Sequence, residues 1–305
     1  MKNIITENTC INAIRFLSID MVQKANSGHP GAPMSLAPVA FILWKDHLNF
    51  NPNDPEWINR DRFILSAGHA SALLYSMLYL TGYKLSIEDL KQFRQYGSIT
   101  PGHPEFGLTP GVEATTGPLG QGFANGVGMA IAAKKMSQSI PNKKVLNHKI
   151  YSIVSDGDLM EGISSEAASI AGTLRLGNLI YIYDSNNISI EGSTNLAFTE
   201  NVAERFKSYG WDVSEDIPGE DTKKITNAIE NAKNETEKPS LIILKTKIGF
   251  GSPNKSGKET AHGEALGEEE VKLTRKALGW SHDPFEIPEE VPFGRVISTF
   301  TGLGS

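Results

Sequence analysis

Residues 150–157 read IYSIVSDG. The run from Ile150 to Val154 is apolar at nearly every position, which is typical of a strand buried on both faces in a parallel sheet. Two similar runs follow, at Leu179 to Tyr183 and Leu241 to Leu244. A strand, a helix and a second strand form a crossover unit, so we expect an α/β fold with an open, doubly wound parallel sheet and helices on both faces. The helix between the first two runs is predicted to bury a face made of Met160, Ile163, Ala167, Ile170 and Leu174.

Helices and loops are predicted to alternate before this unit. Apolar residues recur at helical spacing over residues 9–25, and helices are also predicted for residues 72–80 and 123–136. Residues 26–33 and 97–122 are rich in glycine and proline and are predicted to be loops. Residues 97–122 form a long irregular segment, and such segments in compact domains usually carry function.

The composition limits the classes of partner. The chain has 35 acidic and 29 basic residues among 305, a net charge of −6, which argues against a nucleic-acid partner. Its only cysteine, Cys10, has no internal disulfide partner and fits a reducing compartment. The polar start lacks the apolar core of a signal peptide, and no apolar run has the length of a membrane span. We therefore expect a cytoplasmic protein with no membrane partner.

Two polar residues follow predicted strands, at the edge where open α/β sheets bind ligands. Asp156 follows the first strand and Asn186 follows the second. A carboxylate and an amide oxygen suit Mg²⁺ or Ca²⁺ with phosphate oxygens completing the shell. Gly157 lets a phosphate approach the backbone, and the N-terminus of the next helix favours negative charge. The alternative is structural, with Asp156 capping the helix and Asn186 shaping a turn.

A series of motifs resembles one family of enzymes. The pair Asp156-Gly157 and Asn186-Asn187 is similar to the two-part motif by which thiamin-diphosphate enzymes hold the diphosphate through a divalent metal. The surrounding motifs resemble those of transketolases, in the same order along the chain. They are SGHPG at 27–31, SAGH at 66–69, PGHPE at 101–105, the diphosphate loop at 115–122, the metal-binding stretches at 156–162 and 184–192, GFGS at 249–252 and AHG at 261–263.

The transketolase resemblance implies a metal and a cofactor with particular ligands. The metal would be Mg²⁺, with Ca²⁺ or Mn²⁺ as alternatives, held by Asp156, Asn186 and the backbone oxygen of Ile188. The cofactor would be thiamin diphosphate. Its implied contacts are His69, Gly117, Pro118, Leu119, Gly157, Glu161, Asn186 and His262.

The same resemblance divides the histidines into two groups. Three of them, His29, His103 and His262, are implied to meet the hydroxyls and carbonyl of a sugar, with His262 also near the diphosphate. Imidazole suits this role, because it donates or accepts a proton near neutral pH. The histidines that match no motif are predicted to be surface or structural residues: His47, His148 and His282.

Two residues beside the predicted metal site are of separate interest. Glu161 lies in the first turn after Asp156, and the resemblance implies an acid that links the two active sites of a dimer. Ser155 departs from the family, which has glycine before the metal-binding aspartate. Its hydroxymethyl group would either crowd the diphosphate or form a harmless hydrogen bond, so we expect a weaker cofactor affinity at most.

The resemblance implies transfer of a two-carbon ketol unit from a ketose phosphate to an aldose phosphate, in the pentose phosphate pathway. Two alternatives stay open. One is another thiamin-diphosphate enzyme, such as deoxyxylulose-phosphate synthase or dihydroxyacetone synthase; the other is a module that binds thiamin diphosphate without catalysis. A nicotinamide-dependent dehydrogenase is rejected, because Gly120-Gln121-Gly122 has Asn125 at the third glycine position and no strand before it.

The extent of the resemblance predicts an incomplete enzyme. Residues 1–290 are predicted to be the transketolase N-terminal diphosphate-binding domain, and residues 291–305 a short tail unlike the family. A full transketolase continues for roughly 300 residues, or two more domains of ordinary size, which supply the glutamate that activates the cofactor and most groups that grip the sugar phosphate. We expect this chain to be inactive without a C-terminal transketolase subunit and dimer formation, whether the rest is a separate subunit or was lost by truncation or frameshift.

Overall fold

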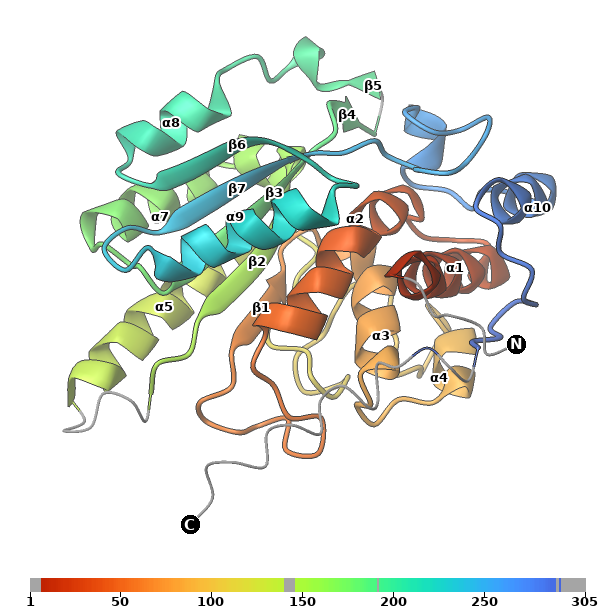
Figure 1. Cartoon of the computed structure of the whole chain (residues 1–305), viewed down its shortest axis with the longest axis horizontal. Helices are drawn as coiled ribbons and strands as arrows, with labels where there is room; N and C mark the ends of the chain where they lie inside the picture. The colour runs from red at the N-terminus through yellow and green to blue at the C-terminus, as the bar shows by residue number, and fades with distance from the viewer. Residues whose placement is uncertain (1–6, 140–145, 191, 289–290, 292–305) are drawn as a thin grey trace.

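The computed structural model describes residues 7–139, 146–190, 192–288 and 291. Its centre is a sheet of five parallel strands in the order β1-β2-β3-β7-β6 (Figure 1). This confirms the predicted open parallel sheet and the pairing of the strands of the crossover unit. The strands are β1 (Arg62–Leu65), β2 (Ile150–Ser155), β3 (Leu179–Ser185), β6 (Asp212–Pro218) and β7 (Ser240–Lys245), and a separate antiparallel hairpin pairs β4 (Ile188–Ser189) with β5 (Gly192–Ser193).

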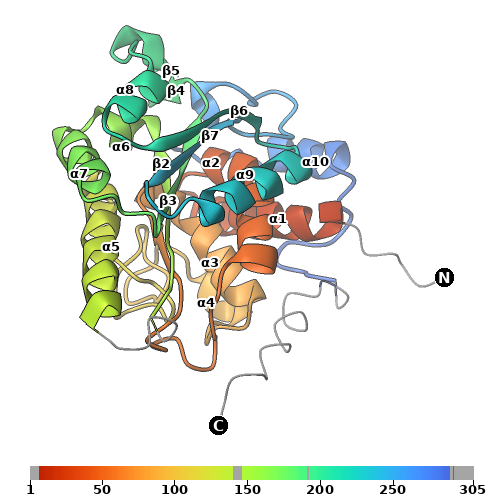
Figure 2. The same ribbon diagram turned by 60° about the vertical axis from the view of Figure 1, so that its left-hand side comes forward.

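Helices cover both faces of the sheet, as predicted (Figures 1 and 2). One face is covered by α1 (Glu7–Ala25), α2 (Gly31–Ile42), α3 (Ser71–Leu80) and α9 (Thr222–Asn234), and the other by α5 (Gln121–Ser139), α7 (Gly162–Thr173) and α8 (Val202–Ser208). No helix in the described part of the chain is long and apolar enough to cross a bilayer. The remaining helices are α4 (Ile87–Lys91), α6 (Asp156–Met160) and α10 (Glu268–Ala277), with shorter helical turns at Leu43–His47, Gly68–Ala70, Thr194–Leu196 and Glu259–Ala261.

Alternate residues of each inner strand enter different cores. In β2, Tyr151 and Ile153 pack against α1, α2, α3 and α9, whereas Ile150 and Val154 pack against α5, α7 and α8. Because side chains alternate across a strand, a strand covered on both faces must be apolar at nearly every position. This explains why the inner strands could be found from their continuous apolar runs.

The predicted buried face of the helix after β2 is right for Ala167, which is buried, and wrong for three of its large residues. Met160, Ile170 and Leu174 are exposed, at 39%, 49% and 43% of their surface. The segment forms two helices, α6 and α7, and α7 packs through its small residues instead: Ser164, Ala167, Ala168 and Ala171. Close approach of α7 to α5 and the sheet leaves room only for short side chains, so the large apolar residues lie on the outer side.

Other predicted elements differ at their boundaries or were missed. Helix α2 begins at Gly31, inside the predicted loop at 26–33. Residues 92–120, all of them described, form no helix or strand, which confirms the long irregular segment. Strand β6, with the sequence DVSEDIP, was missed because it is an edge strand with a break in its register between Ser214 and Ile217 and carries mostly polar side chains.

Candidate active site

The carboxyl ends of β2 and β3 bring Asp156 and Asn186 to the same edge of the sheet. The two strands are in register up to Ser155 and Asp184, so the residues that follow them start side by side. Asp156 is the first residue of α6, and Asn186 directly follows β3. This is the edge at which open parallel sheets bind ligands.

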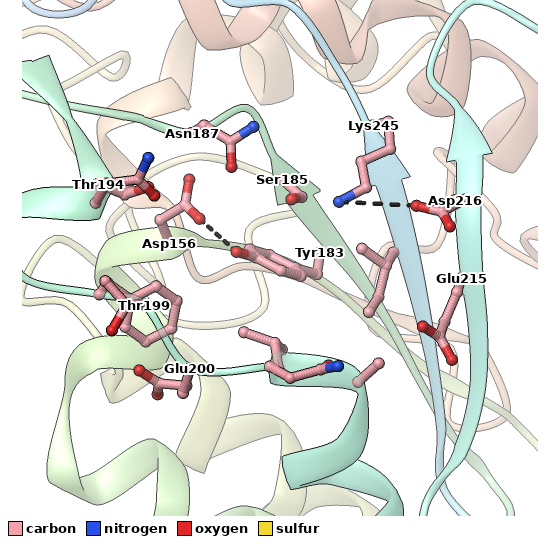
Figure 3. A pocket seen from close by; sticks show the side chains of 16 residues that line it. Asp156, Tyr183, Ser185, Asn187, Thr194, Thr199, Glu200, Glu215, Asp216 and Lys245 are labelled. Carbon is pink, nitrogen blue, oxygen red and sulfur yellow. Dashed lines mark hydrogen bonds and ion pairs between the residues drawn. The ribbon is translucent and has the colours of Figure 1, made fainter.

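Asp156 is a buried carboxylate with one oxygen unused. Its Oδ1 accepts a hydrogen bond from the Tyr183 hydroxyl, and Figure 3 shows the other oxygen pointing away from that ring. Oδ2 is buried and has no hydrogen-bond partner among the described residues. Burial raises the pKa of Asp156 to about 6, against the opposing effects of the Tyr183 hydroxyl and the Asn186 backbone N–H. A buried carboxylate oxygen with no partner fits a metal ligand, because a bound cation would compensate its loss of water.

The side chain of Asn186 is fixed by two hydrogen bonds. Its Nδ2 donates to Asp184 Oδ2 at 3.1 Å, and its Oδ1 accepts from the Ile188 backbone N–H at 2.9 Å. Asp184 also accepts a hydrogen bond from the Thr246 hydroxyl, and burial raises the pKa of Asp184 to about 7. Asn186 therefore shapes a turn, the structural alternative, while its amide oxygen keeps a second lone pair for a cation.

Ser155, rather than Asp156, caps helix α6. The Ser155 hydroxyl accepts from the Asp158 backbone N–H, and the Ser155 backbone N–H donates to Asp158 Oδ2, which makes a reciprocal capping box. The proposal that Asp156 serves as the cap is therefore wrong. Of the two outcomes considered for the Ser155 hydroxyl, the structure shows the hydrogen bond; its effect on cofactor affinity stays a prediction.

The diphosphate loop lies against the start of α6 and the loop after β1. A Cβ built on Gly157 would lie 2.9 Å from Leu119 Cδ1, and one on Gly68 would lie 2.7 Å from the Gly117 backbone nitrogen. Gly117 itself has a φ of +146°, which favours glycine, and a Cβ there would lie 3.2 Å from His103 Cγ. The loops predicted to contact the cofactor thus meet at one place. Pro118 of this loop is exposed.

Three of the predicted site histidines form a compact cluster. The ring centroids of His29, His69 and His262 lie 5.2 to 5.4 Å apart, although the three residues come from distant parts of the chain. His29 Nδ1 is buried and has no hydrogen-bond partner within the described residues. His103 lies beside Gly117 in the diphosphate loop, so all four histidines border the same region.

Burial holds these imidazoles in the neutral form. It lowers the pKa of His29 to about 4, and the neighbouring His262, Arg94 and His103 act in the same direction. Burial likewise lowers the pKa values of His69, His103 and His262. A neutral imidazole carries one donor and one acceptor nitrogen, so at neutral pH these rings are able both to give and to receive a proton.

The remaining histidines lie elsewhere. His148 lies just before the start of β2, at the opposite end of this strand from Asp156. Burial lowers the pKa of His148 to about 4. His47 is buried at 5% exposure and ends a helical turn. His282 contacts Trp280 edge to face, and its Nδ1 lies 3.9 Å from a carboxylate oxygen of Glu286. All three positions agree with the predicted structural or surface roles.

Glu161 lies at the junction of α6 and α7 and is exposed. It ends α6 and begins α7, and its side chain makes no capping hydrogen bond. A Cβ built on Gly120 would lie 2.8 Å from the Glu161 Cβ, so the base of this side chain borders the diphosphate loop. Its predicted role between two active sites stays a prediction.

A cavity of about 400 Å³, which Asp156 helps to line, opens between β3, β7, β6 and the start of α8 (Figure 3). Its lining includes the carboxylates of Glu200, Glu215 and Asp216 and the single cation Lys245, which lies 3.8 Å from Asp216. Because carboxylates repel anions, this cavity does not suit a diphosphate. The cluster of Asp156, the glycine-rich loop and the histidines is therefore the better candidate site.

Several residues of this site were missed from the sequence. Tyr183 reads as an ordinary residue of a buried strand, and nothing in the pattern marks its bond to Asp156. Asp184 was seen only as part of a motif. Asp158 carries a signal that could have found it, since serine and aspartate three residues apart at a helix start are typical of a capping box.

Comparison with known proteins assigns this arrangement to a family. The family described as "Transketolase, thiamine diphosphate binding domain" matches residues 6–295. The chain belongs to this family. Its description implies thiamin diphosphate as the ligand of the domain. The match runs past the boundary predicted at residue 290, and the predicted tail lies outside the described residues except for Val291, so that boundary stays a prediction.

Curated transketolases are similar to nearly all of this chain over part of their own length. Transketolase 2 of Escherichia coli (strain K12) is 60% identical over 282 residues, which cover 92% of this chain and 42% of the relative. Transketolase of Nostoc sp. (strain PCC 7120) is 58% identical over 289 residues, covering 93% and 43%. The chain thus spans less than half the length of these relatives.

Solved transketolase structures share the fold. The enzyme of Campylobacter jejuni has a TM-score of 0.92 at 52% identity, covering 96% of this chain and 46% of that one. A transketolase of Pichia stipitis in complex with sedoheptulose 7-phosphate has a TM-score of 0.91 at 48% identity, covering 96% and 44%. Both confirm the thiamin-diphosphate-binding fold expected from the motifs.

Proposed function

We propose that this chain is the N-terminal half of a transketolase. With Mg²⁺ it binds thiamin diphosphate, and with a C-terminal half it transfers a two-carbon ketol unit from a ketose phosphate to an aldose phosphate. The observation that carries the proposal is the buried Oδ2 of Asp156, which has no partner among the residues that the structure describes and lies where the glycine-rich loop and the histidines meet. The cytoplasm stays the expected compartment.

Each group of residues has a distinct task in this proposal. The oxygens of Asp156, Asn186 and the Ile188 backbone would hold the metal. The cofactor would lie against the diphosphate loop and Gly157, with His69, Glu161 and His262 beside it. When bound, thiamin diphosphate supplies the carbon nucleophile that amino-acid side chains lack.

The chain's own contribution to the reaction is proton handling. His29, His103 and His262 would face the sugar, and burial keeps their rings neutral at physiological pH. Each ring is then able to accept a proton from a sugar hydroxyl at one nitrogen, or to donate one from the other. Sugar phosphates as substrates are supported by the related Pichia stipitis transketolase, whose structure contains sedoheptulose 7-phosphate.

Exposed apolar side chains support a protein partner. Each of the following is at least 36% exposed: Ile131 and Met136 of α5, Met160 of α6, Ile170 of α7, and Leu174 directly after α7. An apolar surface of this kind favours association. We propose that it contacts the C-terminal half or a second copy of the chain in a dimer.

The first test is cofactor binding. Titration calorimetry with thiamin diphosphate and Mg²⁺, in the presence of a C-terminal transketolase half, should show binding by the wild type and none by Asp156→Ala. Asp216→Asn is the matched control, because Asp216 lines the cavity beside Asp156 but its side chain is 81% exposed and forms no part of the proposed metal site. Equal affinity in the wild type and Asp156→Ala would remove the metal assignment.

A further inference from the structure

The carboxylate of Asp158 is completely buried and accepts four hydrogen bonds. Its Oδ1 accepts from the Ser66 hydroxyl at 2.7 Å and from the Gly120 backbone N–H at 2.8 Å. Its Oδ2 accepts from the backbone N–H and the hydroxyl of Ser155, at 2.8 and 2.9 Å. Four donors around one carboxylate satisfy it without a cation, and hydrogen bonds to a charged acceptor are stronger than neutral ones.

These donors come from three segments whose relative positions shape the site. Ser66 follows β1, Ser155 ends β2, and Gly120 lies in the diphosphate loop. The Ser66 hydroxyl oxygen also accepts from the Phe123 backbone N–H at 2.9 Å, so the first turn of α5 is tied to the same point. The backbone oxygen of Asp158 accepts from the Ser164 hydroxyl at 2.6 Å, which adds α7.

We propose that Asp158 is a positioning residue, which holds the diphosphate loop at the ends of β1 and β2 in the shape that receives the ligand. The proposal rests on the proposed function, because the ligand of that loop is the diphosphate. A loop fixed before binding loses less conformational freedom when the ligand arrives, so affinity should depend on this carboxylate although it does not touch the ligand.

Asp158→Asn tests the proposal, because an amide offers one oxygen where the four donors need two. Its NH₂ group would face either the pair from Ser155 or the pair from Ser66 and Gly120. Asp89→Asn is the matched control. Asp89 forms the same capping box with Ser86 at the start of α4, and the hydrogen bonds of its carboxylate within the described residues are to Ser86 alone.

Two measurements distinguish positioning from general stability. In the 305-residue chain, Asp158→Asn should accelerate amide hydrogen exchange at Gly120 about tenfold or more over the wild type. This acceleration should exceed the one at Ile182 in the central strand β3. Calorimetry with the C-terminal half present should show an affinity for thiamin diphosphate and Mg²⁺ weaker by about tenfold or more. Asp89→Asn should change neither quantity.

Each outcome decides the proposal. If exchange at Gly120 accelerates only as much as exchange at Ile182, Asp158 has a general stabilising role and the proposal is overturned. Faster exchange at Gly120 with an unchanged cofactor affinity would overturn the proposal as well. If the wild type binds no cofactor, the proposed function fails while the exchange measurement still decides whether Asp158 fixes the loop. If Asp158→Asn does not fold, Ser66→Ala keeps the carboxylate and removes one donor, and it must then accelerate Gly120 exchange in the same sense.

Discussion

At the scale of single residues, burial sets the chemical state of the candidate site. It lowers the pKa of His29 to about 4 and raises that of Asp156 to about 6. Both side chains also keep a buried polar atom without a partner among the described residues. An unsatisfied buried polar atom costs about 1–3 kcal/mol, so these two atoms fit a ligand site. His47 Nε2 and His148 Nδ1 are unpaired among the described residues as well, so an unpaired atom alone does not mark such a site.

The histidine roles predict a clear difference between positions. In the enzyme reconstituted with a C-terminal half, His29→Ala or His262→Ala should lower ketol transfer by about 10²–10⁴-fold, the usual loss for a proton-transfer group. His148→Ala is the control, since burial also lowers its pKa to about 4 but it lies at the opposite end of β2 from Asp156. Turnover of xylulose 5-phosphate with ribose 5-phosphate is the measurement. Similar losses at all three positions would show an effect on stability rather than on catalysis.

The lowered pKa of His148 predicts that the fold loses stability in acid. Burial, and then the nearby Arg62 and Arg60, lower its pKa from 6.5 to about 4. As the pH falls, the unfolded chain therefore binds a proton first. The stabilising contribution is complete above about pH 6.5 and is lost toward pH 4, by at most about 1.4 kcal/mol per pH unit. Urea unfolding of wild type and His148→Gln should diverge in this window, and parallel pH curves would contradict the prediction.

The candidate site residues were easier to predict from the sequence than the side chains that hydrogen-bond to them. Asp156 and the four site histidines follow strands or lie in glycine-rich loops, so their position follows from the fold. The bond from Tyr183 to Asp156 could not be predicted, because it depends on the distance between a side chain of β3 and one at the start of α6. The pKa of His148 shows that a perturbed value alone does not identify a functional histidine.

At the scale of elements, periodicity located the helices but misassigned one buried face. Large apolar residues of α7 repeat at helical spacing, yet the helix packs through alanine and serine. Periodicity shows only that a helix has an apolar side; the space left by the neighbouring α5 and the sheet determines which side is inside. Strand β6 was missed for the opposite reason, since its place at the edge removes the need for apolar residues on both faces.

Helix α7 therefore predicts an unusual pattern of stability. Ile170→Gln should change the free energy of unfolding of the isolated chain by about 0.5 kcal/mol or less, because its side chain is 49% exposed. Ala171→Leu should cost about 1–3 kcal/mol, because Ala171 is fully buried and an added isobutyl group overpacks the contact. Urea titrations of both variants give the two values. A larger loss for Ile170→Gln would restore the face expected from periodicity.

At the scale of the whole molecule, the chain spans less than half the length of its relatives, and under the proposed function it carries one side of a site. We predict no ketol transfer from xylulose 5-phosphate to ribose 5-phosphate by the purified 305-residue chain. Activity should appear when a C-terminal transketolase half is added, and the Asp156→Ala chain should fail to restore it. Metal-dependent turnover by this chain alone, with host transketolase excluded, would refute the proposal.

The hydrogen bond between Ser66 and Asp158 joins residues 92 positions apart in the chain. The edge strand β1 likewise pairs only with β2 in the sheet, and β2 is synthesised much later. Contacts between such distant residues close large loops and form slowly. The sheet pairing of β1, and with it the ligand-binding end of the sheet, therefore cannot form until β2, which ends at Ser155, has been synthesised.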